Sequence, residues 1–215
     1  MEDYLIIIST FLAAYLIGST PTAVWLGEAY FGIDVRNYGS GNAGATNTFR
    51  VLGKKAGMIV MLVDLLKGWV ASSLAVLLVV TESISFDELL LYKLLLGIAA
   101  VAGHIFPVFA QFRGGKGVAT LLGMILSIHI EAALICVGIF ILVFSLSKYV
   151  SLGSMIAALA FPVLLLLPKF NPHEPVVVIF AFALFAIVVL THQKNIKRLI
   201  KGEESKLYLR RRIKS

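Results

Sequence analysis

The apolar residues of this chain are gathered into seven long runs, and this pattern constrains the fold more than any other feature. A helix that crosses the hydrocarbon layer of a membrane needs about 20 mostly apolar residues. Runs of roughly this length take up most of the 215 residues. The runs are Tyr4–Leu26, Gly57–Val80, Leu89–Phe109, Gly117–Ile130, Ala132–Leu146, Leu152–Leu167 and Val176–Leu190.

The composition agrees with a membrane location. Hydrophobic residues make up 59% of the chain and charged residues only 14%, and the mean hydropathy is +0.93. Such a chain has too few polar side chains to cover a core with a water-facing surface. We therefore expect an all-α fold, a polytopic membrane bundle of seven transmembrane helices. Residues 1–215 are predicted to form a single integral membrane domain, because no length remains for a soluble one.

The fourth and fifth runs are short for full spans. One long, tilted helix is an alternative to two separate spans. A hairpin is favoured, because Ser127, His129 and Glu131 cluster where a turn at the outer face would fall.

Lys and Arg are distributed unevenly along the chain. Of the 19 basic residues, 16 fall in alternate breaks between the runs or in the tail after residue 190. The positive-inside rule then predicts an outside N-terminus and a cytoplasmic C-terminus, which requires an odd number of spans. The first residues lack a basic stretch and a cleavage pattern, so the first run is expected to remain as a span. The last ten or so residues, Lys206–Lys214, are expected to form a basic tail near anionic lipid headgroups.

A glycine-rich polar segment, Asn37–Arg50, occupies the first predicted cytoplasmic break. Its glycines allow backbone N–H groups to approach an anion closely, and hydroxyl and amide side chains alternate with them. Arg50 adds a planar guanidinium that fits phosphate oxygens. The segment is a candidate phosphate site, and the alternative is an ordinary polar turn.

A second segment, Phe112–Thr120, places glycines and Lys116 directly before an apolar run. Glycines at a helix start can present N–H donors, and the helix N-terminus adds positive potential. The spacing is not that of a nucleotide-binding Walker loop, because Ala110 stands where the first glycine is needed and Gly117 follows the lysine. The segment indicates a phosphate site without a nucleotide, and the alternative is a flexible loop.

Two further polar segments, Lys148–Ser154 and Thr191–Arg198, also fall in predicted cytoplasmic breaks. His192 and Asn195 are three residues apart and share a helix face. The His192 imidazole is either a polar anchor or a group that donates to phosphate or accepts a proton. Asp64 and Lys67, inside the second run, have the spacing of a pair that neutralises itself, and a structural role is favoured over a catalytic one.

Several chemistries are excluded by spacing. No His is followed five positions later by Asp, as acyl-CoA-dependent glycerolipid acyltransferases require, and there is no G-x-S-x-G nucleophile motif. No carboxylates cluster for Mg²⁺. We expect no metal and no other cofactor. The single Cys136 excludes an internal disulfide.

Together these motifs resemble those of the bacterial acyl-phosphate:glycerol-3-phosphate acyltransferases, the PlsY family, over nearly the whole chain. The matching motifs are Gly18-Ser19-x-Pro21, Gly39–Asn47, Asp64-x-x-Lys67-Gly68, Gly103-His104-x-x-Pro107, Gly114–Gly117, Ser151-Leu152-x-Ser154 and His192-x-x-Asn195-Ile196-x-Arg198-Leu199.

The resemblance implies an enzyme that moves a fatty acyl group from acyl phosphate to the 1-position of glycerol 3-phosphate, giving lysophosphatidic acid and phosphate. It also implies a bacterial inner membrane location, a cytoplasmic active site and functional coupling to the soluble enzyme that makes acyl phosphate. No nucleic acid partner is expected. The resemblance carries over Ser40, Arg50, Lys116, Ser151 and His192 as catalytic residues. The residues expected to bind substrate are Asn42, Asn47, Gly114, Gly115, Gly117 and Asn195.

Direct transfer fits both the residues and the resemblance. Acyl phosphate is an activated mixed anhydride, so holding two anions together and aligning the glycerol hydroxyl can suffice without an acyl-enzyme. The main rival is a transporter of a phosphorylated metabolite, and a binding-only scaffold is a third hypothesis. A transporter places its anion site near the middle of the membrane, whereas these donors lie in cytoplasmic breaks.

Overall fold

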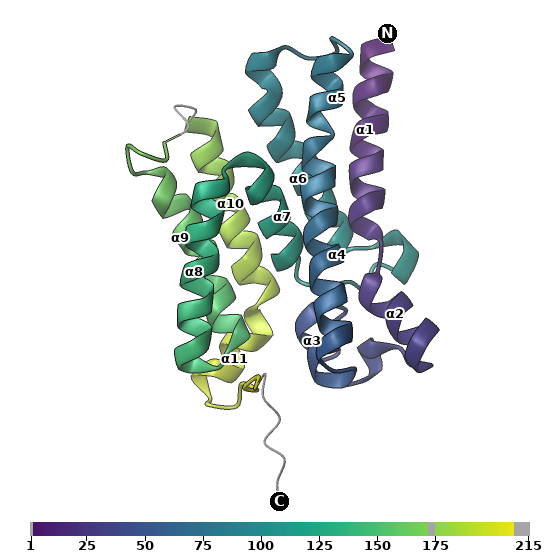
Figure 1. The fold of residues 1–215 in the computed structure, drawn as a ribbon, viewed down its shortest axis with the longest axis vertical. Helices are drawn as coiled ribbons and strands as arrows, with labels where there is room; N and C mark the ends of the chain where they lie inside the picture. Colours follow the sequence, from purple (N-terminus) through teal and green to yellow (C-terminus); the bar gives the residue numbers. More distant parts are fainter. Residues whose placement is uncertain (1, 172–174, 209–215) are drawn as a thin grey trace, which may run out of the picture. The chain divides into compact units, whose positions relative to one another are not determined.

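The computed structural model describes residues 2–171 and 175–208, and all regular secondary structure in these ranges is helical (Figure 1). The all-α prediction is therefore confirmed for this part of the chain. The contacts divide the chain into two compact units, Met1–Ile130 and Glu131–Ser215. Tail residues 209–215, which include four basic residues of the predicted tail, Arg210–Arg212 and Lys214, lie outside the described residues.

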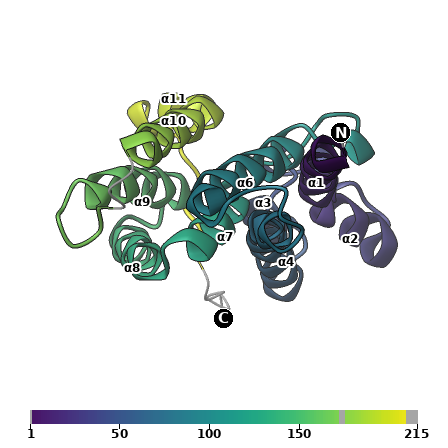
Figure 2. The same cartoon turned by 90° about the horizontal axis from the view of Figure 1, so that it is seen from above.

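The first unit is built around a long central helix, α4 (Lys54–Ser73), which packs against all six other α-helices of the unit. Helices α1 and α6 also run most of the length of the unit (Figure 1). In the view from above, α1 and α4 are seen nearly end-on (Figure 2). The unit's α-helices besides α4 are α1 (Glu2–Ser19), α2 (Thr22–Phe31), α3 (Ala45–Val51), α5 (Ala75–Val80), α6 (Leu89–Ile105) and α7 (Val118–Ile128). Its 3₁₀ turns are η1 (Val35–Asn37), η2 (Phe86–Glu88) and η3 (Val108–Ala110).

Helices α4 and α7 approach each other closely because each has a glycine at the point where it meets the backbone of the other. A Cβ on Gly68 would overlap the carbonyl of Thr120, and a Cβ on Gly123 would overlap that of Leu65. Close approach of small residues is how helices gain contact in lipid, where burial of apolar side chains supplies little driving force. The start of α7 is thereby fixed against the middle of α4.

An apolar cluster joins α2 and η1 to α4. Ala23, Val35 and Val60 are almost completely buried against one another, with Leu26 and Leu52 packed around them. These contacts fix α2, η1 and α3 at one end of the first unit, opposite α5 (Figure 1). The candidate phosphate segments are attached to this end.

The second unit contains α8 (Ile130–Ser147), α9 (Val150–Leu165), α10 (Pro175–Thr191) and α11 (Gln193–Ile200). Helix α9 packs against α10. The chain bends by 63° between α10 and α11, so α11 leaves the direction of the apolar helix before it. The break carries His192, one of the predicted site residues.

The helices follow the predicted apolar runs with one clear difference. The run Tyr4–Leu26 was expected to be one span, but α1 ends at Ser19 and α2 begins at Thr22. Pro21 explains the break, because proline has no N–H to donate and disfavours helical geometry in the residue before it.

The fourth and fifth runs form two separate helices. Helix α7 ends at Ile128, and His129 leaves helical geometry with φ −148° and ψ 87°. One uninterrupted helix over both runs is therefore excluded.

Within the described residues, four helical stretches are long and apolar enough to cross a membrane: Glu2–Ser19, Lys54–Val80 (α4 with α5), Phe86–Ala110 (η2, α6 and η3) and Ile130–Ser147. The bent pair α10 and α11 is a fifth candidate if it counts as one span. Helices α7 and α9 are apolar but shorter, with 11 and 16 residues.

Candidate functional site

The first glycine-rich segment is held in shape by Asn47, which is buried on α3. Its Oδ1 accepts hydrogen bonds from the backbone N–H and the hydroxyl of Ser40, at 2.8 and 3.2 Å. Its Nδ2 donates to the carbonyls of Val35 and Tyr38, at 2.8 and 3.1 Å. Asn47 was predicted to bind substrate, but its donors and its acceptor are used within the loop. Its structural effect is to position Ser40.

The remaining predicted residues of this segment flank that anchor. Asn42 is half-buried before α3, and its Oδ1 lies next to Gly44, where an added Cβ would come within 2.8 Å. Arg50 is half-buried in the last turn of α3, whose N-terminal end begins at Ala45. The segment therefore places a hydroxyl, an amide and a guanidinium on one short helix and the loop that leads into it.

The second segment folds back onto the end of α6. The N–H of Gly114 donates to the carbonyl of Ile105 at 3.2 Å, and that of Gly115 donates to the carbonyl of His104 at 3.1 Å. Both N–H groups were expected to face an anion and are instead used within the protein. The expected cradle of N–H donors can therefore begin only after Gly115.

Lys116 and Gly117 lead directly into α7. Gly117 is the N-cap residue, with φ +78°, a conformation that glycine adopts without strain. No side chain caps this helix, and the first N–H groups of any α-helix lack partners within it. The start of α7 thus combines N–H donors, the positive end of a helix dipole and the charge of Lys116.

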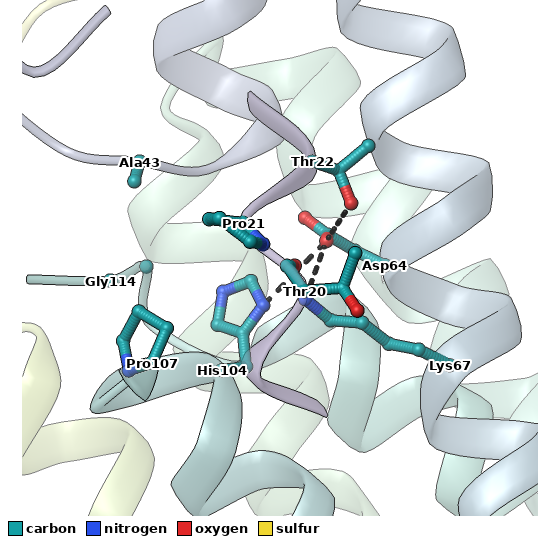
Figure 3. Close-up of a pocket in the computed structure, with 10 residues that line it drawn as sticks. Thr20, Pro21, Thr22, Ala43, Asp64, Lys67, His104, Pro107 and Gly114 are labelled. Carbon is teal, nitrogen blue, oxygen red and sulfur yellow. Dashed lines mark hydrogen bonds and ion pairs between the residues drawn. The ribbon is translucent and has the colours of Figure 1, made fainter. Parts of the chain in front are cut away.

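A buried polar cluster lies behind this second segment (Figure 3). The carboxylate of Asp64 is 2.9 Å from the ammonium of Lys67 and 3.7 Å from Nδ1 of His104. Lys67 also donates to the carbonyl of Thr20 at 3.0 Å, at the break between α1 and α2. The predicted pairing of Asp64 with Lys67 is confirmed.

A small pocket adjoins the cluster and has room for about one water molecule, about 10 Å³. Ala43 from the first segment and Gly114 and Gly115 from the second contribute to its wall. The other lining residues are Thr20, Pro21, Thr22, Asp64, Lys67, His104 and Pro107. The buried cluster therefore contacts both segments that were predicted to bind phosphate.

In the second unit, two predicted residues meet at a carboxylate that the sequence analysis did not select. Ser151 Oγ donates to Glu204 Oε1 at 2.8 Å, and Asn195 Nδ2 donates to the same oxygen at 2.6 Å. Arg198 Nε donates to the other oxygen at 2.7 Å. A sequence signal existed, because Glu203 and Glu204 are the two acidic residues of an otherwise basic tail.

The charge state of Glu204 follows from these contacts. Burial raises the pKa of Glu204, but the hydrogen bonds from Arg198, Asn195 and Ser151 outweigh burial and hold the pKa below its ordinary value. Glu204 is therefore ionised at neutral pH. Ser151 must use its hydroxyl proton for this carboxylate, which leaves lone pairs on its oxygen.

His192 is buried at the junction of α10 and α11. Its Nδ1 lies 2.8 Å from the carbonyl of Val188. A carbonyl only accepts hydrogen bonds, so Nδ1 carries a proton and Nε2 is the basic nitrogen of the neutral ring. This arrangement suits an imidazole that accepts a proton, or that donates to an anion once it is protonated.

No group of three or more His, Cys, Asp and Glu side chains in the described ranges is arranged to hold a metal ion. The candidate ligands for a substrate are the cationic, amide and hydroxyl groups described above. Their chemistry favours anionic oxygen as the group that is bound.

Comparisons with known proteins agree with this chemistry. The model of the glycerol-3-phosphate acyltransferase family matches residues 8–202. The chain is 41% identical to a glycerol-3-phosphate acyltransferase of Chlorobaculum parvum, over 94% of this chain and 99% of that protein. It is 43% identical to one of Enterococcus faecalis, over 94% and 92% of the two chains.

Solved structures extend the similarity to the fold. A crystal structure of PlsY (YgiH), an integral membrane glycerol 3-phosphate acyltransferase in its glycerol 3-phosphate form, matches with a TM-score of 0.81 and 35% identity. Its lysophosphatidic acid form matches with a TM-score of 0.79 and 33% identity. Each match covers 94% of this chain and 96% of the other. This chain is therefore an all-helical integral membrane protein that belongs to the glycerol-3-phosphate acyltransferase family.

Proposed function

We propose that this protein transfers a fatty acyl group from acyl phosphate to the 1-hydroxyl of glycerol 3-phosphate and releases lysophosphatidic acid and inorganic phosphate. The observation that carries the proposal is the match, over 94% of the chain, to an acyltransferase solved in glycerol 3-phosphate and lysophosphatidic acid forms. Those two molecules are the acceptor and the product of this reaction. The family match favours this reaction over transport of a phosphorylated metabolite.

Acyl phosphate is the proposed donor because the residues suit it. Its acyl carbon is already activated, and its leaving group is a phosphate that cationic and N–H donors stabilise. In the first unit we assign phosphate binding to Arg50, Lys116 and the start of α7, with Ser40 and Asn42 as neutral ligands. An acyl-CoA donor is disfavoured because no His is followed five positions later by Asp, the spacing found in acyl-CoA-dependent glycerolipid acyltransferases.

In the second unit we assign substrate contacts to Ser151, His192 and Asn195. Ser151 already donates its proton to Glu204, so its oxygen is suited to accept a hydrogen bond from a substrate hydroxyl. His192 is oriented with Nε2 as its basic nitrogen. Glycerol 3-phosphate has both hydroxyl and phosphate groups for these three side chains to bind.

The proposed topology has seven spans, an outside N-terminus and a cytoplasmic C-terminus, within one integral membrane domain in the bacterial inner membrane. Helix α7 has 11 residues and is about 16 Å long, roughly half the thickness of the hydrocarbon layer. A helix of this length reaches the outer face only if its start, beside Lys116, lies below the cytoplasmic surface. The donors would then be partly removed from water, which strengthens their interaction with phosphate.

Labelling of single cysteines in intact cells tests this topology, with Cys136 first replaced. Cysteines at Ser83 and Asn171 should react with a membrane-impermeant reagent, and those at Ser40 and Ser205 should not. Reaction at Ser40 from outside would place the glycine-rich segment on the wrong side.

We also propose functional coupling to the soluble enzyme that makes acyl phosphate. Acyl phosphate is amphiphilic and easily hydrolysed, so delivery at the cytoplasmic face protects it from water. Four Lys and Arg residues between Lys194 and Lys201 give α11 and its C-cap a basic surface beside anionic membrane lipid.

The reaction itself is tested with purified protein in detergent or lipid mesophase. Acyl phosphate and glycerol 3-phosphate should give equal amounts of phosphate and lysophosphatidic acid, measured by colorimetry and mass spectrometry. Acyl-CoA in place of acyl phosphate should give no product. Equal or faster turnover with acyl-CoA would reject the proposed donor while leaving the acceptor intact.

A further inference from the structure

Arg36 makes a set of contacts that the proposed function does not yet use. It lies in η1, just before the glycine-rich segment, and its Nε and Nη2 donate to the carboxylate of Asp34 at 2.7–3.0 Å. The same carboxylate accepts the backbone N–H of Arg36 at 2.9 Å. The two side chains are only 11% and 19% exposed. A planar guanidinium facing a carboxylate in this way has a fixed orientation.

The third guanidinium nitrogen of Arg36, Nη1, contacts a segment that is far from Arg36 in the sequence. Nη1 donates to the carbonyl of Ala110 at 2.8 Å and lies 3.4 Å from the carbonyl of Arg113. These two residues belong to η3 and to the turn that leads into Gly114 and Lys116. One side chain thus connects η1 to the segment that carries the predicted phosphate-binding lysine.

The other side of η1 is connected to the first segment. Asn47 donates to the carbonyl of Val35, next to Arg36, and holds Ser40 through its Oδ1. A continuous series of hydrogen bonds therefore runs from Ser40 through Asn47 and η1 to Arg36. From there it continues to Arg113, three residues before Lys116.

We propose that Arg36 is a positioning residue of the acyltransferase site, whose guanidinium, oriented by Asp34, holds the Ser40 segment and the Lys116 segment in a fixed relation. The role in turnover rests on the proposed function, whereas the mechanical link between the segments does not. Two donors that bind one phosphorylated substrate must keep their separation, and a misplacement of about 1 Å can reduce the rate about a hundredfold.

The charge states of the pair support this role. The hydrogen bond from Arg36 is the main reason that the pKa of Asp34 is lowered, and the bond to Asp34 raises the pKa of Arg36. Both groups are ionised at neutral pH. A lysine would keep the positive charge but lacks the fork that reaches one carboxylate and two carbonyls together.

Hydrogen exchange measured by mass spectrometry on the full-length protein tests the link without using activity. Arg36→Gln and Arg36→Lys should both increase exchange in peptides covering residues 37–44 and 110–117. The N–H groups of Phe112, Arg113, Gly114 and Gly115 are hydrogen-bonded in the native fold, so their protection is measurable. Arg113→Gln is the matched control, because it removes a neighbouring guanidinium but keeps the backbone carbonyl, and the 37–44 peptides should then exchange as in the wild type.

Kinetics then test the consequence for the site. Arg36→Lys should lower kcat/KM for glycerol 3-phosphate about a hundredfold, with a raised KM, while the apparent Tm stays close to that of the wild type. An increase in exchange confined to residues 34–44 would overturn the link between the segments. Normal kcat/KM for Arg36→Lys would overturn the positioning role. Lack of any wild-type acyl transfer would count against the proposed function alone, since the exchange measurement is independent of it.

Discussion

The ammonium of Lys67 lies 2.9 Å from the carboxylate of Asp64, one helical turn away on α4, and the two side chains are only 5% and 3% exposed. A charge in this position is stable only with its partner, because removing one member of a buried pair leaves the other charge uncompensated. Lys67 also ties α4 to the carbonyl of Thr20, where α1 gives way to α2. The pair therefore belongs to the architecture of the first unit.

We predict that Asp64→Asn and Lys67→Met each destabilise the protein by about 3–5 kcal/mol. Replacing both residues, as Asp64→Leu with Lys67→Met, should cost less than the two single losses added together, because no unpaired charge remains. Thermal unfolding in detergent measures these differences. Single variants with wild-type stability but no turnover would instead give the pair a direct part in the reaction.

The spacing of Asp64 and Lys67 made their pairing predictable, because residues three apart on a helix are neighbours. The helices were predictable for a similar reason, since apolar runs of sufficient length favour helices in lipid. Pro21 accounts for the break after Ser19. The hydropathy pattern does not show this break, because apolar stretches lie on both sides of the proline.

A second prediction concerns Gly115, which packs directly on the imidazole of His104. A Cβ at this position would overlap Nε2 of that ring. We expect Gly115→Ala to displace the segment that carries Lys116 and to reduce kcat/KM about a hundredfold. Gly138→Ala is the matched control, because nothing lies within 4 Å of a Cβ there, in the middle of α8. The control should keep full activity and gain up to about 1 kcal/mol of helix stability.

The orientation of Gly114 and Gly115 was not predictable from sequence. Glycines before a helix are compatible with a cradle of N–H donors, and local composition cannot tell whether those donors face a ligand or a carbonyl. Here the carbonyls of His104 and Ile105 accept them, because the chain turns back at η3. That return depends on tertiary packing and on the long-range contacts of Arg36.

Glu204 gives a prediction that depends on pH. Its pKa is held below the ordinary value of 4.5, so the bonds to Ser151, Asn195 and Arg198 stabilise the fold above that value. This stabilisation should be lost as the pH falls through the lowered pKa. Glu204→Gln should therefore reduce the apparent Tm at pH 7, and its difference from the wild type should shrink below about pH 4.

Glu203→Gln is the control for that titration. Glu203 is exposed and adjacent, so its replacement removes the same charge from the same tail. Its unfolding curve should follow the wild type at every pH. If both variants behave alike, net charge rather than the Glu204 contacts would account for the effect. The acidic pair Glu203 and Glu204 stands out in the basic tail, but no local pattern indicates a contact with Ser151, 53 positions earlier, and sequence reasoning therefore did not select Glu204.

The fourth prediction concerns the charged phosphate ligands. Lys116→Ala and Arg50→Ala should each lower turnover at least about a hundredfold, which corresponds to about 3 kcal/mol of lost transition-state stabilisation. The purified variants should remain monodisperse in size-exclusion chromatography. Lys194→Ala removes an exposed charge from α11 and should retain a rate near that of the wild type. A Lys116→Ala enzyme with near-normal kinetics would remove the start of α7 from the phosphate site.

The last prediction is that acyl transfer is direct, with the glycerol hydroxyl attacking the acyl phosphate while both substrates are bound. The hydroxyl of Ser40 is held by the amide of Asn47, and that of Ser151 by the carboxylate of Glu204. Glu204 has a lowered pKa and is a weak base, and an amide is no base at all, so neither serine is activated as a nucleophile. Cys136 is buried within α8.

Direct transfer still requires an acceptor for the proton of the glycerol hydroxyl, which is either Nε2 of His192 or a substrate phosphate oxygen. If His192 only positions phosphate, His192→Asn should lose activity but keep the pH profile of the residual rate. A changed profile would identify the imidazole as the base.

The transfer step is tested separately. Enzyme incubated with labelled acyl phosphate alone should carry no label after an acid quench and intact-protein mass spectrometry. Phosphate release should begin only when glycerol 3-phosphate is added. A stoichiometric acyl adduct on Ser40, Ser151 or Cys136 that glycerol 3-phosphate then discharges would establish an acyl-enzyme instead.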